Sequence, residues 1–416
     1  MINIQDKKDC CGCTACFSVC PKKCITMKAD KEGFSYPVTD KEKCVGCGLC
    51  EKVCPIIRNK HSDEKTSCEN MTKEVFTQKV IADAEEKPDC YIAFNSNDKI
   101  RQRSTSGGFF TAAAEFVLSE KGKVYGVEVD KNKVVRHSCV DNEKALAKFR
   151  GSKYVQSEQN GIYQKIKSDL DSGIWVLYTG TPCQVEGLYN YLGKEYEKLL
   201  TVDIFCHGVG SPKYWNKYVN YMENKYNSKI RAVRFREKTY GYNSACMAVY
   251  FENGKVSRKD HDSDLYWTAF SKCYIFRPSC YDCKFKSLNH RSDFSIGDFW
   301  NTEAGGADFA NSNGCSLVLV HSDKGRRVLE NIKPDLTIKA FDLERALIIN
   351  GGHQISMLIK SSPVPANYSS FTAEAYDKNI ADTTEKYMPL SFSKKIKCYI
   401  KPVIYKLGIL DKLKRI

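Results

Sequence analysis

Residues 10–21 read C-C-G-C-T-A-C-F-S-V-C-P, and the same cysteine spacing is repeated at residues 44–55, which read C-V-G-C-G-L-C-E-K-V-C-P. Both runs follow the pattern C-x2-C-x2-C-x3-C-P. Three thiolates with two residues between neighbours let one tight loop reach three corners of a metal site, and the fourth thiolate must come from elsewhere. The proline turns the chain away after the last cysteine. Soft thiolate ligands in this number are typical of zinc and of iron–sulfur clusters.

The repeated run favours iron–sulfur clusters over zinc. Structural zinc sites take four ligands, often as two C-x2-C pairs, whereas this longer run is typical of bacterial ferredoxins with 4Fe-4S clusters. In two-cluster ferredoxins the fourth cysteine of each run binds the other cluster. This rule assigns Cys10, Cys13, Cys16 and Cys54 to one cluster, and Cys44, Cys47, Cys50 and Cys20 to the second. Cys11 and Cys24 fall outside the pattern, and we expect them to be small packed residues.

Cysteine use and the N-terminal sequence indicate a reducing compartment. The chain has 21 cysteines in 416 residues, and cysteines that bind clusters imply an environment without stable disulfides. No apolar run of the kind that a signal peptide needs precedes Cys10. No stretch reaches the ~18 apolar residues of a membrane span. We therefore expect a cytoplasmic protein of about two or three domains.

The chain is basic, with 64 Lys and Arg against 50 Asp and Glu and a net charge of +14. A basic surface attracts nucleic acid, anionic lipid or an acidic protein. No nucleic-acid-binding motif accompanies the charge, so we expect no nucleic-acid partner. Two interpretations stay open: an ordinary solvated lysine-rich surface, and a face that docks an acidic electron carrier.

Composition divides the chain into four parts. Residues 1–58 hold both cysteine runs and are expected to form an α+β ferredoxin-like dicluster module. Residues 59–88 are polar and are expected to form a linker, with one helix near its end. Residues 89–350 alternate apolar strands with helices, which predicts a mixed α/β domain. Residues 351–416 form a C-terminal extension.

Apolar runs mark the expected strands of the α/β domain. Residues 174–178 and 199–205 are continuous apolar runs, typical of strands that are buried on both faces of a parallel sheet. Pro212 begins an amphipathic helix that ends near residue 226, because proline suits the first helical turn. Residues 230–258 alternate as strands, with an Asn-Gly hairpin turn between them.

Two glycine-containing stretches are candidate phosphate sites. Residues 106–108 (Ser-Gly-Gly) lie between a predicted strand and a predicted helix, where glycine lets backbone N–H groups approach a ligand and the helix N-terminus favours an anion. Residues 150–154 combine Gly with Arg, Lys and Tyr in the same way. The alternative for each stretch is a tight turn without a ligand. The candidate binding residues are Arg103, Ser106, Gly107, Gly108, Gly151, Ser152, Lys153 and Tyr154.

Further cysteines are placed to complete a third cluster. Cys280 and Cys283 form a C-x2-C pair, which needs two more ligands. Cys183 and Cys206 each follow a buried predicted strand, and open α/β sheets place ligands beyond the carboxyl ends of their strands. We therefore expect a third 4Fe-4S cluster on these four cysteines. Cys273 competes with Cys183 for one ligand position, and the alternative is that all are packed free cysteines.

The motifs occur in an order that resembles a known family. The ordered set is Ser106-Gly107-Gly108, Gly151-Ser152-Lys153-Tyr154, Thr179-Gly180-Thr181-Pro182-Cys183-Gln184, Phe205-Cys206-His207-Gly208, Cys280-x2-Cys283, Arg291-Ser292-Asp293 and Ile296-Gly297-Asp298-Phe299-Trp300. Over roughly residues 88–350 this set is similar to the coenzyme F420 hydrogenase/dehydrogenase beta-subunit family.

The resemblance implies a cofactor, partners and an activity. It implies FAD and a 4Fe-4S cluster in the α/β domain, with residues 106–108 and 151–154 lining the flavin site. It makes this a flavin-binding domain and the chain an iron–sulfur flavoprotein oxidoreductase. We expect His207, next to a proposed cluster ligand, and Asp298 to be the titratable groups near the flavin, and we assign neither a catalytic role. The implied partners are a ferredoxin or a deazaflavin (F420) type of redox carrier and an unidentified small-molecule substrate. Relatives fused to a ferredoxin module also suggest polysaccharide biosynthesis as the setting.

Two alternative functions use the same residues. A non-catalytic electron-transfer subunit of a larger redox complex would hold the cofactors without a substrate of its own. A degenerate flavin domain kept as a scaffold would hold clusters without FAD.

The C-terminal tail has its own pattern. Residues 390–416 interleave apolar and basic residues at helical spacing, and Pro402 is expected to break the run. Basic amphipathic helices lie on anionic membranes, so one expectation is peripheral contact with the inner face of the membrane. The other expectation is a helix packed on the domain with its lysines pointing outward.

Overall fold

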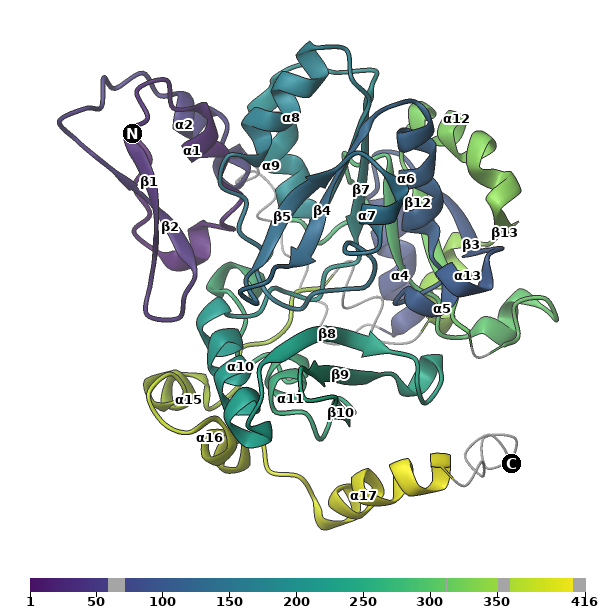
Figure 1. Cartoon of the computed structure of the whole chain (residues 1–416). Helices are drawn as coiled ribbons and strands as arrows, with labels where there is room; N and C mark the ends of the chain where they lie inside the picture. The colour runs from purple at the N-terminus through teal and green to yellow at the C-terminus, as the bar shows by residue number, and fades with distance from the viewer. Residues whose placement is uncertain (59–71, 312, 351–359, 407–416) are drawn as a thin grey trace.

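The computed structural model of the chain describes residues 1–58, 72–311, 313–350 and 360–406. Residues 59–71 of the expected linker and the basic end of the tail, residues 407–416, lie outside the described residues. A cysteine-rich N-terminal module lies beside a large sheet with helices on both faces, and a smaller antiparallel sheet lies below them (Figure 1). The fold is thus a mixed α/β architecture with an N-terminal ferredoxin-like module.

The N-terminal module has α+β structure. Strands β1 (Ile25–Ala29) and β2 (Ser35–Thr39) pair antiparallel. Helices α1 (Ala15–Val19) and α2 (Leu49–Lys52) each begin inside one cysteine run, and α3 (Pro55–Arg58) follows the second run. Helix α1 carries Cys16 and helix α2 carries Cys50, the third cysteine of each run, and each helix leads to the fourth cysteine of its run.

Within the described residues, eight strands form one mixed sheet in the order β13-β3-β12-β11-β7-β6-β4-β5. Neighbours among β4, β6, β7 and β11 pair in parallel, and the outer strands pair antiparallel. The predicted apolar runs are confirmed as β6 and β7. The carboxyl ends of the four parallel strands share one edge of the sheet. The strands are β3 (Asp89–Asn95), β4 (Lys123–Val129), β5 (Val135–Val140), β6 (Val176–Gly180), β7 (Leu199–Ile204), β11 (Phe294–Asp298), β12 (Ser316–Val320) and β13 (Leu336–Ala340).

Helices cover both faces of this sheet because successive strand residues point to opposite faces. Leu177 and Leu200 pack with α6 and α12, whereas Val176 and Leu199 pack with α8 and α9. Helices α4 and α13 cover the β3–β12 end of the latter face. The covering helices are α4 (Lys73–Ala82), α6 (Phe109–Ser119), α8 (Ile162–Asp171), α9 (Pro182–Leu192), α12 (Asp323–Ile332) and α13 (Leu343–Ile349). The predicted helix near the end of the linker is confirmed as α4.

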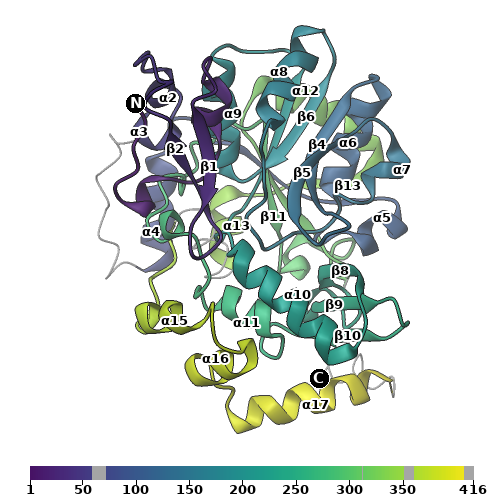
Figure 2. The ribbon, with the colours of Figure 1, turned by 60° about the vertical axis from the view of Figure 1, so that its left-hand side comes forward.

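A second layer forms around the smaller antiparallel sheet. Trp215, Tyr218, Tyr266 and Phe371 share its core. Figure 2 shows α10, α11, α15 and α16 gathered beside this sheet. The elements are α10 (Pro212–Tyr226), β8 (Ile230–Glu237), β9 (Cys246–Phe251), β10 (Val256–Lys259), α11 (Leu265–Ser271), α15 (Tyr368–Glu374) and α16 (Ile380–Tyr387). The predicted helix starting at Pro212 is confirmed.

The tail forms helix α17 (Phe392–Lys406), which continues through position 402 instead of breaking there. It runs along the outside of the second layer (Figure 2). In the part of the chain that the structure describes, none of the helices has both the length and the hydropathy needed to cross a bilayer.

The N-terminal module shares a hydrophobic core with the large sheet. Cys13, Ala15 and Ile56 pack with side chains of α8 and α9. Gly187 in the middle of α9 makes this approach close: a Cβ there would lie 2.8 Å from the Cβ of Cys13 and 2.9 Å from its Sγ. The module is therefore seated directly on the α/β domain.

Candidate functional site

The eight cysteines of the two N-terminal runs line two separate pockets. We call the pocket lined by the first set the middle pocket and that lined by the second set the outer pocket, with empty volumes of about 340 and 370 Å³. The lining cysteines are Cys10, Cys13, Cys16 and Cys54 for the middle pocket, and Cys20, Cys44, Cys47 and Cys50 for the outer pocket. This division, including the exchanged fourth cysteine of each run, is the one that the spacing predicted.

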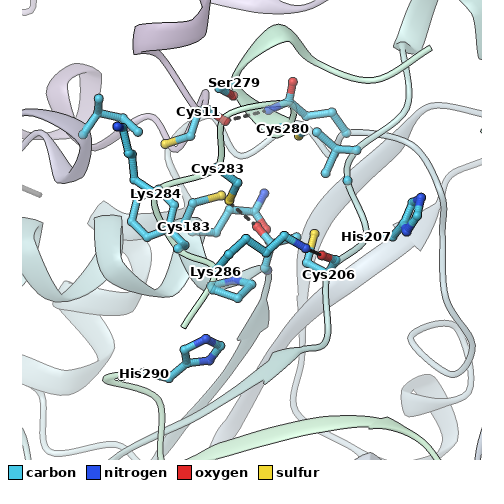
Figure 3. Close-up of a pocket in the computed structure, with 18 residues that line it drawn as sticks. Cys11, Cys183, Cys206, His207, Ser279, Cys280, Cys283, Lys284, Lys286 and His290 are labelled. Atoms are coloured by element: carbon cyan, nitrogen blue, oxygen red, sulfur yellow. Dashed lines mark hydrogen bonds between the residues drawn. The ribbon is translucent and has the colours of Figure 1, made fainter. Parts of the chain in front are cut away.

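A third pocket, the inner pocket, lies at the carboxyl edge of the large sheet and has an empty volume of about 650 Å³. Cys183, Cys206, Cys280 and Cys283 all line it, as Figure 3 shows. Cys183 stands in the first turn of α9 just after β6, and Cys206 follows β7. Cys280 ends the short helix η4 (Pro278–Cys280). Two strand ends and one loop thus bring together four thiols from three distant parts of the sequence.

Burial keeps these thiols neutral in the protein chain alone. It raises the pKa of Cys280 to about 12 and that of Cys283 to about 11, and the pKa of Cys206 lies well above its ordinary value for the same reason. A metal ion deprotonates a thiol that coordinates it. Metal binding at this pocket would therefore release protons.

The surroundings of the inner pocket suit a negatively charged group. Asp203 accepts a hydrogen bond from His290 Nδ1 at 2.8 Å. Burial lowers the pKa of His290, but the Asp203 carboxylate outweighs burial, so the pKa is raised overall. Within the described residues, the buried Nε2 of His290 has no hydrogen-bond partner, and His290 lines the pocket. A histidine in the pocket lining whose pKa is raised by a carboxylate fits a thiolate-bound cluster.

The cysteines do not converge as they would on a single metal ion. Among the described residues, no three His, Cys, Asp or Glu side chains come close enough to hold one ion. A 4Fe-4S cube keeps its four thiolates apart, at the corners of the cluster. Thiols that surround a pocket without meeting at one point therefore fit a cube better than a zinc ion.

Three cysteines outside the expected ligand sets have distinct places. Cys273 does not line the inner pocket; its Sγ lies 3.3 Å from Nε2 of His207. Cys11 is buried, as expected, but it lines both the inner and the middle pocket. Cys24 lines the outer pocket, with its Sγ 3.3 Å from Sγ of Cys20. Cys11 directly follows Cys10, and Cys24 lies four residues after Cys20. This closeness to expected ligands could have indicated that both cysteines line the pockets, but the ferredoxin spacing does not include them.

The two glycine-containing stretches meet in space. The backbone N–H of Ser152 donates to Oγ1 of Thr105 at 2.8 Å. Gly108, with φ of +93°, precedes α6 and makes no side-chain cap, so the first N–H groups of that helix have no capping side chain. These contacts bring residues 106–108 and 151–154 to one place, as a shared ligand would require.

Several of the candidate flavin side chains already have partners in the protein. Lys153 Nζ donates to the carbonyl oxygens of Lys148, Phe149 and Arg150. Ser106 Oγ donates to the carbonyl oxygen of Cys315 at 2.6 Å, and a Cβ on Gly107 would lie 2.3 Å from the carbonyl oxygen of Ala93. These three residues serve the local packing, and Arg103 is exposed. Backbone groups of Gly108 and Gly151 thus fit a ligand better than these side chains do, since the N–H of Ser152 already donates to Thr105.

The two titratable groups proposed near the flavin lie in different surroundings. Asp298, at the end of β11, pairs with the buried Arg236 and accepts a hydrogen bond from Tyr242 at 2.9 Å. The Tyr242 ring stacks on Trp300 with centroids 4.9 Å apart. His207 lines the inner pocket instead. Asp298 is therefore held by an ion pair. Its neighbour Gly297 connects it to the first glycine-containing stretch, because the carbonyl oxygen of Gly297 accepts a hydrogen bond from Ser106 Oγ.

Comparison with known proteins gives two family matches. Residues 174–345 match the model that describes the C terminus of the Coenzyme F420 hydrogenase/dehydrogenase beta subunit. Residues 9–56 match the 4Fe-4S dicluster domain. A chain from the xenon-derivatised F420-reducing [NiFe] hydrogenase complex of Methanosarcina barkeri is similar, with a TM-score of 0.45 and 18% identity over 66% of this chain and 90% of that chain. No curated protein matches the chain.

Proposed function

We propose that the chain, which matches the coenzyme F420 hydrogenase/dehydrogenase beta-subunit family over residues 174–345 and a 4Fe-4S dicluster domain over residues 9–56, is an iron–sulfur flavoprotein oxidoreductase. In this proposal, the chain connects a one-electron carrier at its surface with an FAD and a small-molecule substrate at the edge of the large sheet. A ferredoxin and a deazaflavin of the F420 type are the candidate carriers. Polysaccharide biosynthesis stays a prediction for the biological process in which the chain acts.

The observation that carries the proposal is the spatial arrangement of the three cysteine-lined pockets, from the outer through the middle to the inner pocket. The outer pocket opens to the surface, where Cys47 is exposed and Val45 is 62% exposed. The middle pocket shares Cys11 and Ile56 with the inner pocket. The inner pocket lies at the strand ends, where α/β sheets place their ligands. Such a row supports a path for single electrons from the surface to the sheet edge.

The outer pocket offers a face to a carrier. Exposed apolar side chains of Val45 and Leu49 border Cys47. The exposed lysines Lys22, Lys41 and Lys43 lie in the adjoining loops. An apolar contact with lysines beside it suits an acidic carrier, since complementary charge speeds association. This supports the second of the two interpretations of the net charge, a face that docks an acidic electron carrier.

The same residues suggest how a flavin would be bound. FAD, when bound, would supply two-electron chemistry and exchange single electrons with a cluster, and the protein would supply binding and orientation. Gly108 leaves the first N–H groups of α6 uncapped, which favours a phosphate there. Thr105 and Ser152 hold the two stretches against each other. Arg236 and Asp298, one ion pair at the end of β11, would flank this region.

Substitution at Gly108 tests the flavin site. Gly108→Asp places a carboxylate where the phosphate would bind, and Gly108→Asn is the matched control because it has the same shape without the charge. Both side chains face the same strain at φ of +93°. We expect extracted flavin to be absent from the Asp variant and retained in the Asn variant, with cluster absorbance unchanged in both. Full flavin occupancy in Gly108→Asp would contradict this site, and a wild-type protein with clusters but no flavin would favour the non-catalytic electron-transfer role.

Helix α17 supports the proposed membrane contact. Phe392, Ile396 and Ile400 follow each other at four-residue spacing and are exposed. Lys394 and Lys395 lie between them and pair with Asp262 and Glu385. An exposed apolar stripe beside lysines suits an anionic lipid surface. Phe392→Ser/Ile396→Ser should lower co-sedimentation with anionic vesicles, and equal binding by the variant and the wild type would remove the idea.

A further inference from the structure

Arg277 occupies the boundary between the N-terminal module and the α/β domain. Its side chain is fully buried. Nε donates to the carbonyl oxygen of Cys10 at 2.6 Å, and Nη2 lies 3.4 Å from Sγ of Cys10. Nη2 also donates to the carbonyl oxygen of Ser35, and Nη1 donates to Oε1 of Gln156 at 2.7 Å. One guanidinium therefore binds both halves of the protein.

The charge of Arg277 has no carboxylate partner among the described residues: its contacts are carbonyl oxygens, an amide, the Tyr36 ring at 4.2 Å and the Cys10 sulfur. A buried cation without an anion is costly. The Cys10 sulfur is the contact that becomes an anion when the middle pocket holds its cluster. The arrangement is thus complete only with a thiolate-bound cluster beside the guanidinium.

Arg277 is also joined to the inner pocket by its own backbone. Its carbonyl oxygen accepts a hydrogen bond from the backbone N–H of Cys280 at 2.8 Å. Cys280 lines the inner pocket and Cys10 lines the middle pocket. A single residue therefore spans from the sulfur of one pocket to the backbone of a cysteine in the next.

Gly12 and Gln156 keep the guanidinium in this position. A Cβ on Gly12, at φ of +72°, would lie 2.8 Å from Nη1 of Arg277. Gln156 Nε2 donates to the carbonyl oxygen of Cys11 at 3.1 Å while its Oε1 accepts from Arg277. The loop of the first cysteine run is shaped to admit the guanidinium, and Gln156 ties the same loop to the α/β domain.

We propose that Arg277 is a positioning residue that raises the reduction potential of the middle cluster and couples this cluster to the inner one. Reduction adds one electron, hence one negative charge, to the middle cluster. A fixed cation that donates to a cluster ligand stabilises the reduced form more than the oxidised form, because hydrogen bonds and charges around the sulfurs set the potential. The coupling to an inner cluster rests on the proposed function, whereas the effect on the middle cluster needs only the dicluster domain.

The test is a redox titration of the full anaerobic protein, followed by electron paramagnetic resonance, for wild type, Arg277→Gln and Arg277→Lys. We expect the middle-cluster potential to shift to more negative values in Arg277→Gln and to recover in part in Arg277→Lys, which keeps the charge but loses the planar fork. The outer-cluster potential should not move in either variant. Loss of one signal in Cys47→Ala identifies which wave belongs to the outer cluster.

A second variant covers the case in which Arg277→Gln does not fold. Gln156→Glu keeps the shape of residue 156 and puts a carboxylate on the guanidinium, so the middle-cluster potential should again fall. Arg326→Gln is the matched control, because Arg326 binds Asp89, Asp323 and Glu86 and makes no cysteine contact in the described structure. Its potentials should equal those of the wild type.

The outcomes separate this inference from the proposed function. Unchanged middle-cluster potentials in both Arg277→Gln and Gln156→Glu, at full iron content, would overturn the role of Arg277 and leave the proposed function untouched. An equal fall in Arg277→Lys and Arg277→Gln would also overturn it, because loss of packing and not loss of charge would then be the cause. A wild-type protein with only two clusters would remove the inner partner, while the predicted shift of the middle cluster could still be measured.

Discussion

The N-terminal pockets and the inner pocket use the same ligand atom but are built in different ways. In the first region, two short loops and two short helices carry the thiols. Most of the cysteines that line one pocket therefore lie close together in the sequence. In the inner pocket, Cys183 and Cys206 lie at strand ends and Cys280 and Cys283 in a distant loop, so the sheet must form before the thiols meet. The comparison shows that a local metal site can be found in a sequence by its motif alone, whereas a site assembled by tertiary structure also requires a prediction of where the strands end.

The largest expected effect separates the two regions by their metal content. Cys280→Ser should remove the inner cluster and leave the two N-terminal clusters, because none of the eight cysteines assigned to the N-terminal clusters lines the inner pocket. Iron should fall from about twelve to about eight atoms per chain, since each cube holds four. Cys183→Ala should give the same loss and Cys273→Ala none, since Cys273 lies outside the pocket lining.

Two results would break this picture. Loss of all iron in Cys280→Ser would mean that the two regions do not assemble independently. Loss of the inner cluster in Cys273→Ala, with retention in Cys183→Ala, would mean that the chain rearranges around the cluster.

Features that depend on residues close together in the sequence could be predicted. The exchange of Cys20 and Cys54 between the two N-terminal pockets follows from spacing alone, and Pro212 marked the start of α10 because its fixed φ suits a first turn. The second layer around Trp215 was not predicted as a unit, since its core is completed by segments distant in sequence, such as α15 and α16. Arg277 was missed for the same reason: it contacts Cys10 across 267 positions of sequence. Lys153 was expected to bind a phosphate through its charge. In the structure its Nζ instead donates to carbonyl oxygens of the preceding turn.

The next effect concerns the protonation of the thiols in metal-free protein. At pH 8 a thiol with a pKa of about 12, as for Cys280, is ionised in about one molecule in ten thousand. Because only the thiolate reacts, Cys280 should be alkylated by iodoacetamide about a thousandfold more slowly than an ordinary thiol, whose pKa is about 8.5. Its rate should rise about tenfold per pH unit from pH 8 to 11, because the ionised fraction grows in that proportion below the pKa.

Mass spectrometry of the alkylated protein would check this contrast site by site. Cys47 is exposed and serves as the reference thiol of the N-terminal region. Near-UV circular dichroism should confirm that the metal-free protein is folded at each pH. Equal rates for Cys280 and Cys47 at pH 8 would show that burial does not distinguish the two regions.

The smallest effect concerns the seam between the two regions. Gly187→Ala places a methyl group against Cys13, and overpacking of this kind costs about 1–3 kcal/mol, partly offset by the ~1 kcal/mol that alanine gains over glycine within a helix. We expect bleaching of the middle cluster at lower urea concentration, with iron content unchanged in native buffer. Ser168→Ala on the exposed face of α8 is the matched helix control. A Gly187→Ala protein as stable as this control would mean that the module does not sit tightly on α9.

The most direct test of the account is the content of iron, acid-labile sulfide and extracted flavin in anaerobically purified protein. The account predicts about twelve irons, about twelve sulfides and one FAD per chain, since three cubes each hold four of both. About eight irons and no flavin would contradict it: the N-terminal clusters would stand, and the inner pocket with its four thiols would need a different explanation.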